Sequence, residues 1–342
     1  METENERACN MKQFYVSQLK DQGEIMEFFM VKAIQIRVGS NKKEYLDLTL
    51  GDCSGEISAK KWDLSEDEKP LLGGIREGDL VRVKAQVTEW QGIPQLRVAK
   101  IRAARDADGL SMPDYVKAAP EKPEDMYEAI CGVARSVKDP DLQKLNLALL
   151  GKYQEKLMYY PAASKNHHAE MGGLLWHMKR MLAAGDALCQ VYTFLNRDLV
   201  LTGVIIHDLE KTTEILSNEY GVSPGYSFEG QLLGHIVQGI RELEKTCNEL
   251  EIPREKAILL EHMILSHHYE PDFGSPKKPM FPEAEILHYL DIVDARMYDM
   301  EEAIAGIDPG NFSERVRQLD NRKIYKPTFE EGGVVQEGGE GQ

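Results

Sequence analysis

The sequence predicts a multidomain protein, with an N-terminal all-β barrel followed by a C-terminal all-α domain. Three observations support this prediction. Apolar and polar side chains alternate between Gly, Asn and Asp turns as far as about residue 103, as they do in half-buried strands. From Tyr127 onward the apolar residues recur at helical spacing instead. Three prolines interrupt the stretch between the two patterns, which indicates a linker.

The strand-like segments of the first domain lie at residues 14–19, 24–39, 44–52, 55–62, 79–90 and 94–104. About five short strands with hairpin turns between them predict a small barrel over residues 12–105. The order YLDLTLGDCSGEISAKKW followed by GDLVRVKAQVTEWQGIPQLRVAKIR resembles the OB-fold modules of tRNA-binding and single-strand-binding proteins. Barrels of that type bind strands on one face, through stacked aromatic rings and a few cations.

The aromatic and cationic residues of this region are therefore candidates for nucleic-acid contact. Strand alternation places only one of Phe28 and Phe29 on the outer surface, and each lysine could equally belong to an ordinary solvated face. The candidates are Phe28, Lys32, Arg37, Lys60, Trp62, Arg82 and Trp90.

A linker is expected at residues 106–126, where Pro113, Pro120 and Pro123 prevent a continuous helix. Seven helical patterns follow with no strand pattern among them, which predicts an all-α domain over residues 127–325. The acidic, glycine-rich residues 326–342 are expected to form a disordered tail. The helical patterns lie at residues 126–137, 141–159, 172–195, 197–216, 230–250, 254–268 and 283–307.

Charge and composition limit the partners and the compartment. The formal net charge of −16 argues against a nucleic-acid partner for the chain as a whole, but residues 11–105 carry 16 Lys and Arg against 14 Asp and Glu. The first domain is thus the better docking place for a polyanion. Five scattered cysteines indicate reduced thiols, and no segment has the roughly 20 apolar residues of a membrane helix. We expect a cytoplasmic protein without a membrane partner.

An adjacent His207-Asp208 pair ends the apolar run VLTGVII, where an unpaired carboxylate would be costly to bury. Other polar residues stand in similar apolar helical contexts, one on each of several helices, which is how a helical bundle builds an interior metal site. These residues are His177, His235, His267, His268 and Asp291. Imidazole and carboxylate ligands together suit a divalent ion of the Mn, Fe, Zn or Mg class.

The order of these residues resembles the HD superfamily of metal-dependent phosphohydrolases. The segments NHHAEMGGLLWH, HDLEK, GQLLGHI and ILSHHYEPDFGSPKKPMFPEAEILHYLDIVDARM are similar to the YhaM family of 3'-5' exoribonucleases, in which an OB-fold module precedes the HD domain. The resemblance covers roughly residues 12–325. Members of the superfamily often have glycine before the lysine of HDLEK, where this chain has Glu210.

The resemblance implies that His177, His207, Asp208 and Asp291 hold a first divalent ion. It also implies that Asp208, His235 and His267 hold a second ion, if one is present. Manganese is the preferred metal, with Mg, Fe, Co or Zn as alternatives. Asp294 shares the helical face of Asp291 and could replace it, or could support another ligand.

Four further residues complete the predicted site. Lys211 lies one turn after the pair and would neutralise substrate phosphate, although it could be an ordinary solvated lysine. His268 could face either the metal or the substrate. Lys277 and Lys278, on a proline-bounded loop, would suit contact with a nucleic-acid backbone; the alternative is that they belong simply to a soluble loop.

The predicted function is metal-dependent 3'-5' hydrolysis of single-stranded RNA, with single-stranded DNA as a second substrate, to nucleoside monophosphates. Two alternatives stay open: a nucleotide phosphohydrolase of the HD type, and a nucleic-acid-binding factor with a secondary nuclease activity. The sequence also leaves homo-oligomer formation open.

Overall fold

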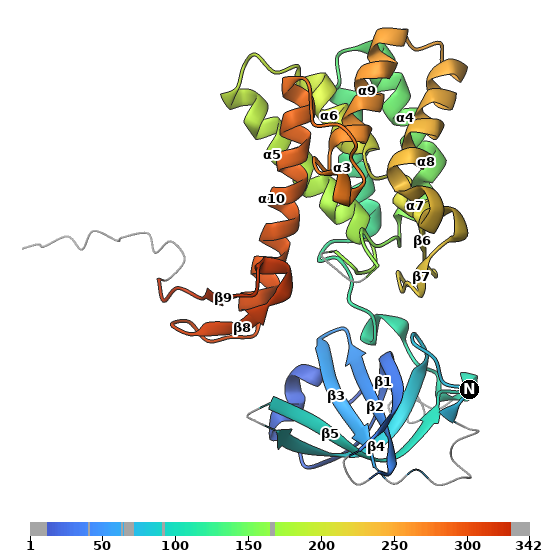
Figure 1. Ribbon diagram of the computed structural model, residues 1–342, viewed down its shortest axis with the longest axis vertical. Coiled ribbons are helices and arrows are strands. Elements are labelled where there is room, and N and C mark those ends of the chain that lie inside the picture. The colour runs from blue at the N-terminus through green and yellow to red at the C-terminus, as the bar shows by residue number, and fades with distance from the viewer. Residues whose placement is uncertain are drawn as a thin grey trace, which may run out of the picture.

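The computed structural model describes residues 12–39, 42–62, 64, 72–90, 93–164 and 168–329. Figure 1 shows a barrel and a helical region at opposite ends of the long axis, joined by a short connection. This architecture confirms the predicted fold class, an OB-fold barrel followed by a helical domain. The tail predicted at residues 326–342 lies mostly outside the described residues.

The barrel closes through five strands in the order β1-β2-β3-β5-β4. β3 and β5 are parallel and the other neighbours are antiparallel. A bulge between Val31 and Ala33 bends the long first strand, so that its first half pairs with β4 and its second half with β2. The strands are β1 (Glu24–Val38), β2 (Glu44–Asp52), β3 (Gly55–Lys61), β4 (Leu80–Trp90) and β5 (Ile93–Ala103).

Alternation along the strands places the apolar residues inside the barrel, as the sequence pattern predicts. Leu46, Leu48 and Leu50 of β2 are buried, while the residues between them are partly exposed. Phe29 is fully buried in the core, and its neighbour Phe28 lies on the outer surface. The alternative between the two phenylalanines is thus decided in favour of Phe28 as the outward residue.

The strand predicted at residues 14–19 is wrong. The segment forms the 3-10 helix η1 (Val16–Asp21) instead. Because the five strands already close the barrel, no free edge remains for a sixth. Carboxylates of Asp52 and Glu27 accept the backbone N–H groups of residues 13, 14 and 16, and Leu19 is buried in the barrel core.

The connection between barrel and helices contains the 3-10 turns η2 (Asp106–Asp108) and η3 (Met112–Asp114). It is packed rather than free. Tyr115 and Val116 are buried in a small cluster with Met30 of the barrel. Partly buried residues of the helical region, among them Met171 and Val222, cover the same cluster.

The helical region shares one large apolar core. Proline occupies an early position in α3, α4 and α10, and the side chains of Asp139, Asn196 and Ser227 accept N–H groups at the starts of α4, α6 and α8. The helices are α3 (Pro123–Ser136), α4 (Pro140–Leu157), α5 (Gly173–Val191), α6 (Arg197–Ile206), α7 (Lys211–Glu214), α8 (Phe228–Glu249), α9 (Arg254–Ser266) and α10 (Pro282–Ala305). None of the described helices is both long and apolar enough to cross a bilayer.

Two features differ from the expected run of helices. The helix predicted at residues 197–216 breaks at Ile206. A turn whose backbone hydrogen bonds join residues three apart then leads into the four-residue α7. Two small hairpins also occur, β6 (Ile215–Leu216) with β7 (Gly225–Tyr226), and β8 (Phe312–Val316) with β9 (Arg322–Tyr325). In Figure 1, α10 runs toward the barrel and carries the second hairpin at its end.

Candidate metal centre

The predicted ligands of the helical region converge on Asp208, which follows the end of α6 and is almost fully buried. Its Oδ2 atom lies 3.3 Å from His207 Nε2 and 3.9 Å from His177 Nε2. Its Oδ1 atom lies 3.4 Å from His235 Nε2 and 3.8 Å from His267 Nε2. One carboxylate therefore separates two groups of imidazole nitrogens, one on each of its oxygens.

The sixth predicted ligand, Asp291 of α10, joins the group on the Oδ2 side. Its Oδ1 atom is 3.4 Å from His177 Nε2. Asp294, one turn later, takes a different place, because its Oδ2 atom is 2.8 Å from His177 Nδ1 on the far side of the ring. Asp291 and Asp294 thus contact opposite edges of the His177 ring. Asp291 lies on the edge that faces the centre, and Asp294 holds the edge that faces away from it.

Backbone and carboxylate acceptors fix the tautomers of these histidines. Nδ1 of His207 donates to the carbonyl of Val204 at 2.8 Å, and Nδ1 of His267 donates to the carbonyl of Ile264 at 2.7 Å. Since a carbonyl can only accept, the proton of each neutral ring resides on Nδ1. The Nε2 lone pairs consequently point toward Asp208.

The residues present fit a bound cation. Within the described residues, six buried atoms at this centre form no hydrogen bond: the Nε2 atoms of His177, His207, His235 and His267, and both carboxylate oxygens of Asp208, of which Oδ2 lies beside the ammonium of Lys211. Leaving a buried polar atom unsatisfied costs about 1–3 kcal/mol, so this many in one place are unstable without a further partner. Each of these atoms offers a lone pair when its ring is neutral or its carboxyl group ionised, which is the requirement for holding a divalent metal.

The electrostatics of the centre also favour a cation. Burial alone would raise the pKa of Asp208, but His207 and Lys211 hold that pKa well below its usual range. Burial lowers the pKa of His267 well below its usual range and keeps that ring neutral. Burial works in the same direction on His177, but Asp291 and Asp294 overcome it and raise the pKa of His177 to about 9. The Asp208 carboxylate therefore stays ionised, and its negative charge attracts a cation.

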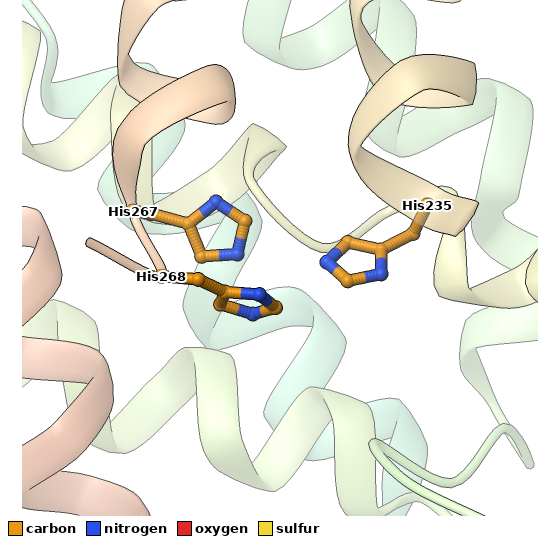
Figure 2. A group of neighbouring side chains, drawn as sticks. All are labelled: His235, His267 and His268. Carbon is orange, nitrogen blue, oxygen red and sulfur yellow. The ribbon is translucent and has the colours of Figure 1, made fainter. Parts of the chain in front are cut away.

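His235 reaches the centre because α8 is kinked one residue earlier. Gly234 has φ 67° and ψ 168°, a conformation that only glycine adopts readily. The kink immediately precedes His235, whose ring points toward His267 and His268 (Figure 2). Its Nδ1 atom is 2.9 Å from Oε2 of Glu214, a half-buried residue of α7 that the sequence reasoning did not identify.

His268 lies beside the Oδ1 group. Figure 2 shows it with His267 at the end of α9 and with His235 of α8, and one nitrogen of each lies within 4.8 Å of the others. Nδ1 of His268 donates to the carbonyl of Phe273 at 2.6 Å, so Nε2 of the neutral ring is an acceptor. Burial lowers the pKa of His268, which keeps the ring neutral.

The two charged residues after the His-Asp pair face different ways. Lys211 Nζ is 2.6 Å from Asp208 Oδ2, and this lysine is largely buried. Glu210, which stands where glycine is common, hydrogen-bonds to the hydroxyl of Tyr153. The extra carboxylate therefore faces Tyr153 of α4 and not the group around Asp208.

The loop after α9 leaves both predicted lysines exposed. Lys278 Nζ lies over the ring of Tyr269, 4.4 Å from its centroid, and 3.8 Å from a carboxylate oxygen of Glu270. Lys278 is therefore already engaged by two neighbours in the same loop.

The predicted barrel residues divide between different parts of its outer surface. Phe28 pairs with Arg82 across β1 and β4, and the guanidinium groups of Arg82 and Arg102 lie over its ring. Trp90 and Ile93 face solvent together at the β4–β5 hairpin. Lys32 lines a cavity described below.

A third part of the barrel surface combines an aromatic pair with cations. Trp62 stacks on Tyr45, with ring centroids 4.4 Å apart. Arg37 pairs with Tyr45 across β1 and β2, and Lys60 pairs with Arg97 across β3 and β5. Tyr45 was not among the predicted contacts, because its ring is placed only by the register of β2.

Comparisons with known proteins agree with the fold of both the barrel and the helical region. Residues 23–104 match the OB-fold nucleic acid binding domain family, and residues 174–296 match the HD domain family. A curated 3'-5' exoribonuclease YhaM from Geobacillus sp. (strain WCH70) is 40% identical over 312 residues, which are 91% of this chain and 94% of that protein. The protein of the same name from Halalkalibacterium halodurans is 40% identical over 311 residues, 90% of this chain and 95% of that protein.

Among solved structures, a replication protein A heterotrimer bound to ssDNA resembles 26% of this chain and 62% of its own, at 17% identity and a TM-score of 0.21. Asparaginyl-tRNA synthetase from Pyrococcus horikoshii resembles 44% of this chain and 37% of its own, at 17% identity and a TM-score of 0.24. These two likenesses are too slight to bear on the function.

Proposed function

Because the chain belongs to the YhaM family of 3'-5' exoribonucleases, we propose that the centre around Asp208 carries out hydrolysis at the 3' end of RNA. The protein is a metal-dependent 3'-5' exoribonuclease with an HD domain. The observation that carries the site assignment is the set of six buried atoms, on Asp208 and four histidines, that form no hydrogen bond within the described residues.

In this proposal His177, His207, Asp208 and Asp291 hold the first divalent ion, and Asp208, His235 and His267 hold the second. The division follows the two oxygens of Asp208, each of which faces its own imidazole pair. Divalent ions held there would polarise the phosphoryl oxygens and activate water. Manganese is our preferred ion, and the mixed His and Asp ligands also suit Mg, Fe, Co or Zn.

The side chains around this centre orient the reacting groups. Water attacks the terminal phosphorus, a new P–O bond forms, and the bond to the 3'-oxygen of the preceding nucleotide breaks. That oxygen takes up a proton and becomes the new 3'-hydroxyl of the shortened RNA, and a nucleoside monophosphate is released. We assign Lys211 to the phosphate, since its ammonium lies beside Asp208, and His268 to the attacking water. His268 Nε2 is an acceptor in the observed tautomer and can take the proton that the water loses.

We propose that the RNA strand lies along the part of the barrel that carries Trp62 and Tyr45. The stacked rings offer a platform for a base, and Arg37 and Lys60 supply positive charge near it. Stacking does not depend on the sugar, so single-stranded DNA should bind the same surface. Phe28 with Arg82, the exposed Trp90, and the loop lysines Lys277 and Lys278 are secondary contacts in this proposal.

A cavity of about 800 Å³ lies between another part of the barrel and the helical region. Lys32 and Thr49 line it from the barrel, Lys117 from the connection, and Ser164 and Ser217 from the helical region. Thr49 is four residues from Tyr45 on β2, or about 13 Å at roughly 3.3 Å per residue. A strand stacked on Tyr45 and Trp62 would therefore reach the cavity after two or three nucleotides.

The four described cysteines carry no disulfide, which favours a reducing compartment such as the cytoplasm in our proposal.

The proposed function is tested with 5'-labelled single-stranded RNA of two kinds, one with a free 3'-hydroxyl and one with a 3'-phosphate. With Mn²⁺ we expect mononucleotide release from the first, little from the second, and none from either after chelation. Equal degradation of both RNAs would refute the 3'-5' polarity. Intact RNA together with hydrolysis of free nucleotides would instead favour a nucleotide phosphohydrolase.

A further inference from the structure

The connection between barrel and helices is bonded to a loop of the metal centre. Ala118 and Met171 form a parallel β-bridge. The N–H of Met171 donates to the carbonyl of Lys117 at 3.0 Å, and the N–H of Ala119 donates to the carbonyl of Met171 at 2.9 Å. Any shift of the connection therefore moves the segment that leads into α5 and His177.

The same loop carries a buried histidine that supports a proposed metal ligand indirectly. His168 is fully buried, and its Nε2 atom is 2.8 Å from Oδ2 of Asp294. That oxygen also receives Nδ1 of His177 at 2.8 Å. The other oxygen of Asp294 is 2.7 Å from Nε of Arg180. Asp294 thus fixes the edge of His177 that faces away from the centre, with His168 and Arg180 holding the carboxylate.

Tyr298 of α10 links this arrangement back to the connection. Its ring packs on His168, with centroids 4.1 Å apart. Its hydroxyl donates to Oε2 of Glu170 at 2.9 Å and accepts from Nζ of Lys117 at 2.8 Å. Lys117 also lies 2.5 Å from Glu302 and lines the cavity between barrel and helices. Lys117 thus lines the cavity on the proposed strand path and also contacts Tyr298, which packs on the histidine that holds Asp294.

We propose that Lys117, Tyr298 and His168 are positioning residues that couple the interdomain connection to the metal ligand His177. The proposal rests on the proposed function, because it requires His177 to hold an ion. Groups that support a metal-bound imidazole typically affect metal affinity by 10- to 100-fold. Coupling of this kind is reciprocal, so metal binding must also stabilise the connection.

The proposal is tested by substituting Lys117, which is partly exposed and can be changed without opening the core. Lys117→Met removes the ammonium, Lys117→Arg restores a donor, and Lys122→Met removes an exposed lysine five residues away. Titration of each metal-free protein with Mn²⁺ should give an affinity about 10-fold weaker in Lys117→Met. Lys117→Arg and Lys122→Met should stay near the wild type.

The second readout is amide hydrogen exchange of the segment that contains Ala119. Mn²⁺ should slow this exchange in the wild type and in Lys122→Met, but much less in Lys117→Met. Tyr298→Phe should behave like Lys117→Met, whereas Tyr127→Phe, which removes a hydroxyl bonded to the carbonyl of Leu150, should not. A purely structural role would alter melting temperatures without removing the response to Mn²⁺.

Two outcomes would overturn the proposal, and they are distinguishable. Wild-type Mn²⁺ affinity and a wild-type exchange response in Lys117→Met would refute the coupling and leave the metal centre intact. A wild-type protein that binds none of Mn²⁺, Mg²⁺, Fe²⁺, Co²⁺ and Zn²⁺ would refute the proposed metal centre itself, and the coupling with it.

Discussion

The metal centre and the barrel surface use polar side chains in opposite ways. Around Asp208 the side chains are buried, each imidazole is oriented by its own Nδ1 partner, and the lone pairs face inward. On the barrel, Arg37 and Trp62 are exposed, with Arg37 paired to Asp47 and Trp62 stacked on Tyr45. The first arrangement fixes positions, whereas the second offers adaptable surface.

This difference shows which part of the protein must hold its side chains in fixed positions. Hydrolysis depends on groups held within fractions of an ångström, so the centre is built on helices and supported from behind. A strand that moves by one nucleotide after each cleavage requires contacts that every base can make, and stacking meets that need. Substitutions should accordingly have steep effects at the centre and graded effects on the barrel.

The largest effect is expected for Asp208→Asn. The amide keeps the shape but loses the charge that faces both imidazole groups and Lys211, so the turnover rate on 3'-hydroxyl RNA with Mn²⁺ should fall by a factor on the order of 10³ or more. Asp125→Asn changes an exposed carboxylate of α3 in the same way and should keep full activity. If Asp208→Asn retained more than about a tenth of the rate, the centre would lie elsewhere.

Gly234→Ala should have the next largest effect. Alanine is strained by about 1–3 kcal/mol at the observed φ and ψ, and relief of that strain would turn His235 away from Asp208. We expect Mn²⁺ binding at least about 10-fold weaker, measured by calorimetry, consistent with loss of one ligand. Gly132→Ala is the matched control, because its added methyl meets open space. Unchanged Mn²⁺ affinity in Gly234→Ala would remove His235 from the ligand set.

The sequence singled out residues that the structure brings together around Asp208, and the reason is physical. Each of His177, His235 and His267 stands in an apolar, helix-period context, where a polar side chain needs a partner. One such residue on each of several helices can be satisfied only if the helices bring them together. The same logic identified Asp291 and Asp294 but could not distinguish them, since both share one face of α10.

The remaining details depend on contacts that no local pattern records. Apolar periodicity continues through residues 197–216, so it gave no sign that α6 ends at Ile206, where tighter turn bonds place His207 and Asp208 in one site. Glu214 is an ordinary helix residue in the sequence and acquires its role only because His235 folds back onto it. The bonds between the connection and Met171 likewise exist only in the assembled fold.

The smallest effect, and the one that tests the other half of the comparison, is expected for Trp62→Ala. Base stacking on one ring contributes about 1–3 kcal/mol, which corresponds to roughly 5- to 150-fold in affinity. Because the metal centre is untouched, KM for RNA should rise within this range while kcat stays near the wild-type value. Phe194→Ala removes an exposed ring of the helical region and should change neither constant. A fall in kcat without a change in KM would contradict an adaptable binding surface and place Trp62 in the alignment of the scissile bond.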